Sequence, residues 1–144
     1  MNREELKTIL PHREPMLLLD EAVRNEDGSA TAYYTVRGDE YFLQGHFPGN
    51  PLVPGVIQCE MMAQSACVLF AEEMRGKDVL PVYTGIDKVR FRGMVKPGDC
   101  IRIDTKEVRS CPPMYVLHSE LTVDGKRCAG GELSFAIVPR AGTQ

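Results

Sequence analysis

Three features that suit acid–base chemistry beside a carbonyl group fall within fifteen residues of one another. The first is His46, in the segment QGHFPGNPLVPG, where prolines and glycines alternate. Prolines fix the backbone and glycines permit unusual dihedral angles, so we expect one defined path that holds the imidazole at a set angle. An imidazole gains or loses a proton near neutral pH, which suits a general base. The alternative is a histidine without a chemical role in a turn-rich surface loop.

The second feature is Glu60, in a segment where twelve of the sixteen residues from Val56 to Ala71 are apolar. The four polar residues do not share one side of a helix, which predicts a buried helix. A charged carboxylate is costly there, so Glu60 must be paired, hydrogen-bonded or protonated, unless its side chain reaches solvent at the helix edge. A protonated carboxyl group can act as a general acid. We expect Gln64, one turn later, to orient this group with little effect on folding.

The third feature is the start of this helix at Pro54 and Gly55. The first amides of a helix, here from Gly55 onward, have no partner within the helix and can face a cleft. These donors and the helix dipole stabilise a developing oxyanion. A base, an acid and an oxyanion site together predict removal of a proton beside a carbonyl group, with loss or gain of water.

Other residues carry weaker signals. His118 lies in a strand pattern and is expected to be structural, whereas His12, between two prolines in LPHREP, either fixes its loop or lines a cleft. Lys88, Arg90 and Arg92 alternate along one predicted strand and form a small basic row, which is either a solvated face or a contact for an acidic partner. The chain contains no nucleophile-elbow, phosphate-loop, zinc-protease or dinucleotide-binding motif.

The expected order of secondary structure, with strands, then one long buried helix and then further strands, predicts an α+β domain. Asn2 and Glu5 form a capping-box pattern for a short first helix, and a long buried helix is expected from Pro54 to Met74. The segment 38–54 is irregular. Strands are expected at 16–24, 30–37, 82–91, 100–109, 114–123 and 126–138. One curled sheet covers a buried helix on one side only, so we expect a second copy of the molecule to close the core.

Composition limits the class of protein. The 144 residues, 43% apolar and 26% charged, fit one globular domain spanning 1–144. A net charge of −3 argues against nucleic acid as the main partner. Five cysteines without a C-x-x-C pair indicate reduced thiols in a cytoplasmic compartment, with no metal site. The first residues do not form a signal peptide, and no apolar run is long enough for a membrane span.

Four segments carry a family resemblance that runs in order from about Leu10 to Ile137. The sequences LPHREPMLLLD, GHFPGNPLVPGVIQCEMMAQ, GIDKVRFRGMVKPGD and VDGKRCAGGELSFAI closely resemble the (3R)-hydroxyacyl-[acyl-carrier-protein] dehydratases of the FabZ type. The resemblance implies a hotdog fold, in which a curved antiparallel sheet wraps around one long helix. It also implies a homodimer with a continuous sheet and two shared active sites, often assembled as three dimers in a hexamer.

The resemblance also assigns roles by position. The catalytic base falls on His46 and the acid on Glu60, with the amide of Gly55 on the thioester carbonyl and Gln64 supporting the acid. The second ring nitrogen of the histidine would bind the carbonyl of Leu52. Apolar side chains, including those of Phe42, Phe47 and Met61, would exclude water and leave room for an acyl tail.

The family uses neither a metal nor an organic cofactor, and its substrate is a thioester on the phosphopantetheine arm of acyl carrier protein. Such a carrier is acidic, and Arg90 and Arg92 are candidates to dock it. Related dehydratase-isomerases carry Asp where this chain has Glu60. Glu14 and the turn at 110–113 depart from the family pattern, which affects expectations about chain length and carrier docking.

Two other functions fit the same fold. A hotdog thioesterase would hydrolyse the same thioester, but such enzymes usually need a carboxylate that activates water, and they lack the GHFPG loop. A non-catalytic module that binds acyl thioesters would keep the fold without the pair of His46 and Glu60. The dehydratase is therefore the first prediction, and analysis of the product separates the three.

Overall fold

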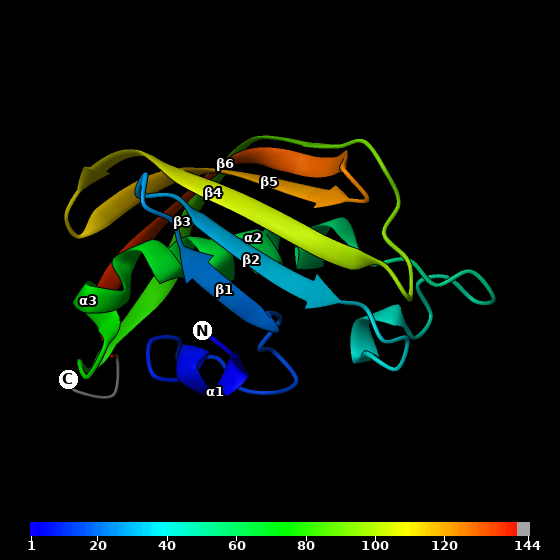
Figure 1. The fold of residues 1–144 in the computed structure, drawn as a ribbon, viewed down its shortest axis with the longest axis horizontal. Helices are drawn as coiled ribbons and strands as arrows, with labels where there is room; N and C mark the ends of the chain where they lie inside the picture. Colours follow the sequence, from blue (N-terminus) through cyan, green and yellow to red (C-terminus); the bar gives the residue numbers. More distant parts are fainter. Residues whose placement is uncertain (141–144) are drawn as a thin grey trace.

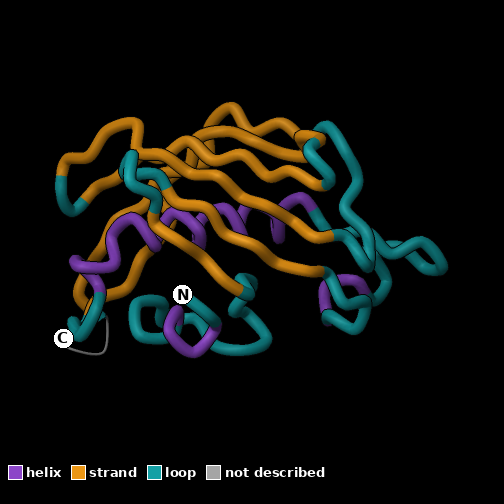
Figure 2. Tube along the Cα trace, viewed as in Figure 1, coloured by secondary structure: helices purple, strands orange, loops and turns teal. Residues whose placement is uncertain are grey.

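A single curved antiparallel sheet wraps around one long helix in the computed structural model, which describes residues 1–140. The order of the strands is β1-β2-β4-β5-β6-β3. Their bounds are β1 (Glu21–Arg24), β2 (Ala30–Thr35), β3 (Val79–Phe91), β4 (Cys100–Cys111), β5 (Met114–Val123) and β6 (Lys126–Pro139). The last four residues of the expected domain, 141–144, lie outside the described part of the chain. This architecture is the predicted hotdog fold, which Figures 1 and 2 show with the helix along the inside of the sheet.

The central helix is found where the apolar pattern predicted it, but it is not uniform. The α-helix α2 (Gly55–Cys67) is followed by the 3₁₀ turn η2 (Val68–Phe70) and by α3 (Ala71–Met74). At this interruption the ring of Phe70 packs on Tyr115, with ring centroids 4.2 Å apart, and on Phe135. The buried side of α2, including Met61 and Met62, shares one apolar cluster with strands β4, β5 and β6.

Most polar groups inside this apolar helix have specific hydrogen bonds, the exception being the buried Oε1 atom of Gln58, which has no partner among the described residues. The hydroxyl groups of Ser65, Thr105 and Ser119 form a buried chain, with oxygen–oxygen distances of 3.3 and 2.8 Å. The side-chain amide of Gln58 donates to the carbonyl of Val53 at 3.1 Å, which fixes the loop directly before the helix. Buried polar groups need such partners because an unpaired group costs free energy.

The first part of the chain differs from the prediction. The short helix α1 (Arg3–Leu6) begins with the expected capping box between Asn2 and Glu5. The predicted strand 16–24, however, is a strand only from Glu21. The backbone of residues 16–18 instead forms hydrogen bonds with the side chain of Gln64 on α2. These bonds replace strand pairing, and the leucines of this segment are still buried in the core.

The basic row predicted on β3 is interrupted. A bulge shifts the register between Asp87 and Arg90, and Lys88 has a left-handed φ of 54°. The bulge lets the backbone of Val89 approach Gly131, where a Cβ atom would lie only 2.6 Å from the Cα atom of Val89. Lys88 therefore does not alternate regularly with Arg90, and the expected row was wrong. Arg90 and Arg92 are both exposed.

Strand β3 is an edge of the sheet and pairs only with β6 among the described residues. It is 13 residues long, and its apolar side chains Val82, Tyr83 and Ile86 are 37–52% exposed. A long exposed edge strand with apolar side chains tends to pair with another chain, and proteins usually protect or cover such an edge. No helix within residues 1–140 combines the length and the apolar character needed to cross a membrane.

Glu40 anchors the chain that leads from β2 to the His46 segment. Its buried carboxylate accepts hydrogen bonds from the hydroxyl of Tyr34 at 2.7 Å and from the amides of Arg37 and Gly38 at 2.9 and 2.8 Å. Burial acts to raise the pKa of Glu40, but these donors outweigh it and hold the pKa below its ordinary value. The folded state therefore prefers the ionised carboxylate.

We predict that Glu40→Gln lowers the free energy of unfolding at pH 7 by about 1–3 kcal/mol, because the new amide faces donors. A depressed pKa in the folded state gives stability that is present above the unfolded pKa of about 4.3 and is lost as pH falls through the folded pKa. Urea unfolding at one protein concentration should therefore show a smaller loss below pH 5 for Glu40→Gln than for the wild type. Asp39→Asn, on the exposed neighbouring carboxylate, is the control. Equal acid sensitivity of Glu40→Gln and wild type would contradict the prediction.

Candidate active site

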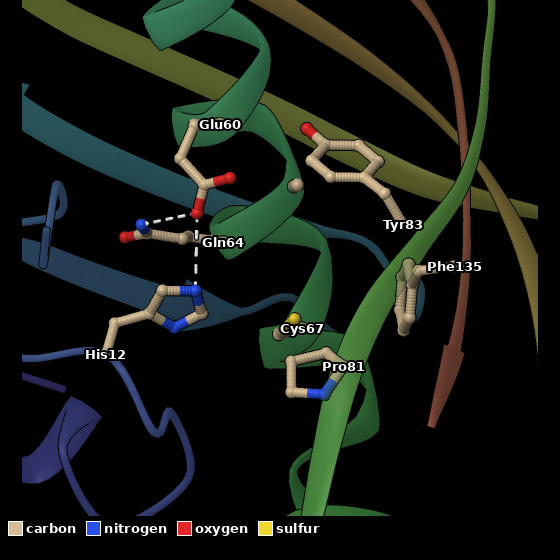
Figure 3. Close-up of a pocket in the computed structure, with 8 residues that line it drawn as sticks. His12, Glu60, Gln64, Cys67, Pro81, Tyr83 and Phe135 are labelled. Atoms are coloured by element: carbon tan, nitrogen blue, oxygen red, sulfur yellow. Dashed lines mark hydrogen bonds and ion pairs between the residues drawn. The ribbon is translucent and has the colours of Figure 1, made fainter. Parts of the chain in front are cut away.

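One stripe of α2 lines a cavity between the helix, strand β3 and the loop after α1. Glu60, Ala63, Gln64 and Cys67 follow the i, i+3, i+4, i+7 spacing that places residues on one helix face. The remaining lining side chains are His12, Pro81, Tyr83 and Phe135, and Figure 3 draws the lining residues as sticks. The cavity measures about 40 Å³. Sites for organic ligands usually measure several hundred Å³, so this cavity in one protomer is too small for an acyl chain.

The carboxyl group of Glu60 is held on one side. Its Oε2 atom accepts a hydrogen bond from Nε2 of Gln64 at 2.9 Å, and Nε2 of His12 lies 3.2 Å from the same oxygen. The side chain of Glu60 is 21% exposed, so it opens to the cavity and is not free in solvent. The helix-edge alternative, in which this side chain escapes to solvent, is wrong because Gln64 and His12 retain it in the cavity.

Gln64 has a second task that the sequence did not predict. Its Oε1 atom accepts from the amide of Leu18 at 2.9 Å, and its Nε2 atom donates to the carbonyl of Met16 at 2.7 Å. Gln64 is almost completely buried. The hydrogen bond to Glu60 agrees with the expected orienting role, but the contacts with residues 16–18 lead us to expect an effect on folding as well.

Cys67 and Tyr83 in this cavity are held in their neutral forms. Burial, with Glu60 nearby, raises the pKa of the Cys67 thiol to about 12. Burial is also the main reason why the pKa of Tyr83 is raised, and its hydroxyl donates to the carbonyl of Cys59 at 2.7 Å. A thiol with such a pKa is not a nucleophile at neutral pH. The cavity thus offers a carboxyl group for chemistry rather than a thiolate.

His46 is held by its own loop. Its Nδ1 atom lies 3.1 Å from the carbonyl oxygen of Leu52, and the amide of Leu52 donates to the carbonyl of His46 at 2.8 Å. Phe47 stacks on the imidazole, with ring centroids 4.1 Å apart. A ring that donates from Nδ1 to a carbonyl keeps its Nε2 lone pair free to accept a proton. This loop, between Leu43 and Pro54, extends away from the sheet in Figure 1.

The start of α2 leaves amides available. The amides of Ile57 and Gln58 both donate to the carbonyl of Pro54, at 3.0 and 3.1 Å. Among the described residues, none accepts a hydrogen bond from the amide of Gly55 or Val56. The ring of Phe91 lies against Gly55, and a Cβ atom on Gly55 would be 3.0 Å from it. Because Gly55 has no side chain, the first turn of the helix fits beside the ring of Phe91.

Within one protomer, the predicted site residues form two groups. The first contains Glu60 and Gln64, and the second contains His46 and Leu52. No hydrogen bond, ion pair or ring contact among residues 1–140 joins His46 to Glu60, and His46 does not line the cavity beside Glu60. Each group holds one of the two residues that the sequence predicts to form an acid–base pair.

Of the three aromatic or apolar residues expected around the site, two lie in the core and one stays beside His46. Met61 is fully buried in the core on the other side of α2, so its expected place at the acyl tail is wrong. Phe42 is buried in the same core, and Phe47 is half exposed on the His46 loop. The other two histidines differ in their surroundings, since His12 contacts Glu60 whereas His118 lies 3.3 Å from Glu120 on the sheet. Within residues 1–140, no group of three or more His, Cys, Asp or Glu side chains is arranged to hold a metal ion.

Comparison with known proteins gives consistent relatives. The model of the FabA-like domain family matches residues 10–132. The 3-hydroxyacyl-[acyl-carrier-protein] dehydratase FabZ of Clostridium perfringens is 42% identical over 139 residues, which cover 95% of this chain and 99% of that relative. The FabZ of Lactococcus lactis is 40% identical, with 95% of both chains covered.

A solved structure with the same fold is the dehydratase heterocomplex ApeI:P from Xenorhabdus doucetiae, with a TM-score of 0.80 and 23% identity. The matched region covers 95% of this chain and 92% of the chain in that structure. The fluoroacetyl-CoA-specific thioesterase FlK shares the fold at a TM-score of 0.67 and 10% identity, over 81% and 96% of the two chains. At such identities these two structures establish the hotdog fold alone.

We predict that Gln64→Ala lowers the free energy of unfolding by about 1–3 kcal/mol, because it leaves the amide of Leu18 buried without a partner. The catalytic rate should also fall, roughly 10- to 100-fold, because Glu60 loses a donor. Gln58→Ala is the matched control for stability, since it removes a buried glutamine of the same helix that makes one hydrogen bond, and the wild type is the reference for activity. Urea unfolding and steady-state rates check both effects. A Gln64→Ala protein as stable as Gln58→Ala and as active as the wild type would contradict the assignment.

Proposed function

The chain belongs to the FabA-like domain family, among the FabZ-type dehydratases, and on this premise we propose that it dehydrates (3R)-3-hydroxyacyl thioesters on acyl carrier protein. The product is the trans-2-enoyl thioester, and the reaction serves fatty acid biosynthesis. The observation that carries the proposal is the carboxyl group of Glu60, buried in a cavity and oriented by Gln64. Full-length relatives that are about 40% identical support it.

The first step is polarisation of the thioester carbonyl. The amide of Gly55 stands at the start of α2, where the helix dipole adds to its effect. A hydrogen bond from this amide to the carbonyl oxygen makes the proton on C2 more acidic. Donors aimed at a developing negative charge are among the largest contributions to catalysis.

The second step moves two protons and needs no cofactor. Nε2 of His46 takes the proton from C2, while Nδ1 stays hydrogen-bonded to Leu52. The electron pair of the C2–H bond forms the C2=C3 double bond, and the C3–O bond breaks. Glu60 donates a proton to the departing hydroxyl group, which leaves as water. The mechanism therefore pairs a general base with a general acid.

The two protomers of a homodimer would complete each site. His46 and Glu60 are not together in one chain, the His46 loop extends outward, and the cavity beside Glu60 is too small for the substrate. The exposed β3 edge offers the surface for pairing with β3 of a second copy, which would join the two sheets. A trimer of such dimers is the larger assembly that we propose for this family member.

We propose that Arg90 and Arg92 contribute to docking of the acidic carrier protein. Both are exposed next to Phe91, whose ring contacts the start of α2. Charges at the rim of an interface mainly steer association. The proposed compartment is the cytoplasm, where the five unpaired cysteines remain reduced.

We predict that the purified protein interconverts 3-hydroxyacyl and trans-2-enoyl thioesters, and that a metal chelator does not alter the rate. His46→Ala and Glu60→Gln should each abolish most of this activity, because each lacks one proton-transfer group. Separation of the products by chromatography and mass spectrometry distinguishes the enoyl thioester from a free acid. A free acid would support a thioesterase, no turnover would support a binding module, and loss of activity with chelator would contradict the metal-free mechanism.

Charge reversal tests the docking proposal. Arg90→Glu or Arg92→Glu should raise KM for carrier-bound substrate and spare the same acyl group on coenzyme A, because the lost interaction is with the carrier. Arg109→Glu, at an exposed position of β4, is the matched control. Equal effects on both substrates would indicate damage to the site instead.

A further inference from the structure

His12 reaches the acid from outside the helix that carries it. The loop after α1 brings Nε2 of His12 to 3.2 Å from Oε2 of Glu60, within hydrogen-bonding distance. Both side chains are 21% exposed and line the same cavity (Figure 3). The sequence left open whether His12 fixes its loop or lines a cleft, and the structure places it in the cleft.

The contacts of Glu60 are strongly asymmetric. Its Oε2 atom faces two nitrogen atoms, one of Gln64 and one of His12. Its Oε1 atom has no hydrogen-bond partner among the described residues. In Figure 3 the second oxygen points away from both His12 and Gln64. An oxygen that already accepts from two donors is a poor position for an acidic proton, so the two oxygens are not equivalent.

The imidazole of His12 has one tautomer that fits its surroundings. Its Nδ1 atom is buried and has no partner within residues 1–140. A buried N–H group without an acceptor is rarer in proteins than an acceptor with spare capacity. A hydrogen on Nε2 points at Oε2 of Glu60, whereas a hydrogen on Nδ1 would meet no acceptor among the described residues. His12 is then a donor to the acid rather than a competing base.

The loop that carries His12 is held by its neighbour Arg13. The guanidinium group of Arg13 donates from Nη1 to the carbonyls of Leu10 and His12, at 2.9 and 2.7 Å, and from Nη2 to the carbonyl of Lys7 at 3.3 Å. These bonds fix the backbone on both sides of Pro11. The loop that carries the imidazole of His12 is therefore held in place by Arg13.

We propose that His12 is a positioning residue that holds Oε2 of Glu60, together with Gln64, so that Oε1 carries the proton delivered to the C3 hydroxyl group. This inference rests on the proposed dehydratase function. In the forward reaction the Oε1–H bond breaks as the C3–O bond breaks, and water leaves. The carboxylate that remains keeps both donors on Oε2. His12 thus acts through Glu60 and transfers no proton itself.

Four variants test this role by steady-state kinetics, with formation of the enoyl thioester as the readout. His12→Phe keeps the ring but removes the donor, and we expect kcat to fall about 10- to 100-fold with little change in KM. His12→Gln places its amide nitrogen at the position of Nε2, and it should recover most of kcat. His12→Asn is too short to reach Oε2 and should resemble His12→Phe. His118→Phe, on a histidine paired with a carboxylate away from the cavity, is the matched control and should keep wild-type kcat.

The results separate this inference from the function on which it rests. A wild-type protein that forms no enoyl thioester would overturn the dehydratase proposal itself. With an active wild type, an unchanged kcat in His12→Phe would overturn the role of His12 alone. An equal loss of kcat in His12→Gln and His12→Asn would also overturn the role of His12. If His12 only filled space, the position of the amide nitrogen would not matter, and the two variants would behave alike. If His12→Phe does not fold, the comparison of His12→Gln with His12→Asn decides.

Discussion

The hydrogen bond between Gln64 and Glu60 is the interaction on which the arrangement of the site depends. A carboxyl group on a helix that is covered by a sheet needs partners, and Gln64 supplies one from the next turn. The same amide group also binds the backbone of residues 16–18, so it connects the helix to the loop that carries His12. Removal of this one side chain would therefore disturb the acid, the loop and the packing at once.

The division of the site follows from how the helix is covered. Strands β2, β4, β5 and β6 cover most of α2, and the stripe from Glu60 to Cys67 faces a small cavity beside β3. His46, the proposed base, is on a loop that leaves the body of the protomer just before the helix begins. Glu60 and His46 therefore belong to different parts of the protomer. A second protomer that pairs along β3 is the simplest way to bring them together.

Much of this fold could be predicted from local patterns. The capping box at Asn2, the apolar helix and the four long strands all rest on interactions between residues that are close in sequence or repeat with a fixed period. The errors occur where long-range contacts decide. Residues 16–20 have a strand-like composition, but Gln64 takes over the hydrogen bonds that a neighbouring strand would have made. No local signal reports a partner 46 residues away.

In the site, too, local patterns were predictable and long-range contacts were not. The resemblance to a family placed the candidate residues in sequence, and the side chain of Gln64 was expected near Glu60 because the two are one turn apart. The bulge at Lys88 was not predictable, because it depends on the approach of Val89 to Gly131 on another strand. The contact between His12 and Glu60 depends on the path of a loop between two prolines, which residue types alone do not specify.

The central claim is that His46 of one protomer acts with Glu60 of its partner, and mixed dimers test it most directly. His46→Ala and Glu60→Gln proteins, each inactive alone, are unfolded and refolded together, and mass spectrometry verifies that mixed dimers form. If the site is shared, a mixed dimer has one site with both substitutions and one intact site. Dehydratase activity should then return to about a quarter of the wild-type value when protomers pair at random. If both residues act within one chain, every site keeps a substitution, and mixed dimers without activity would contradict the account.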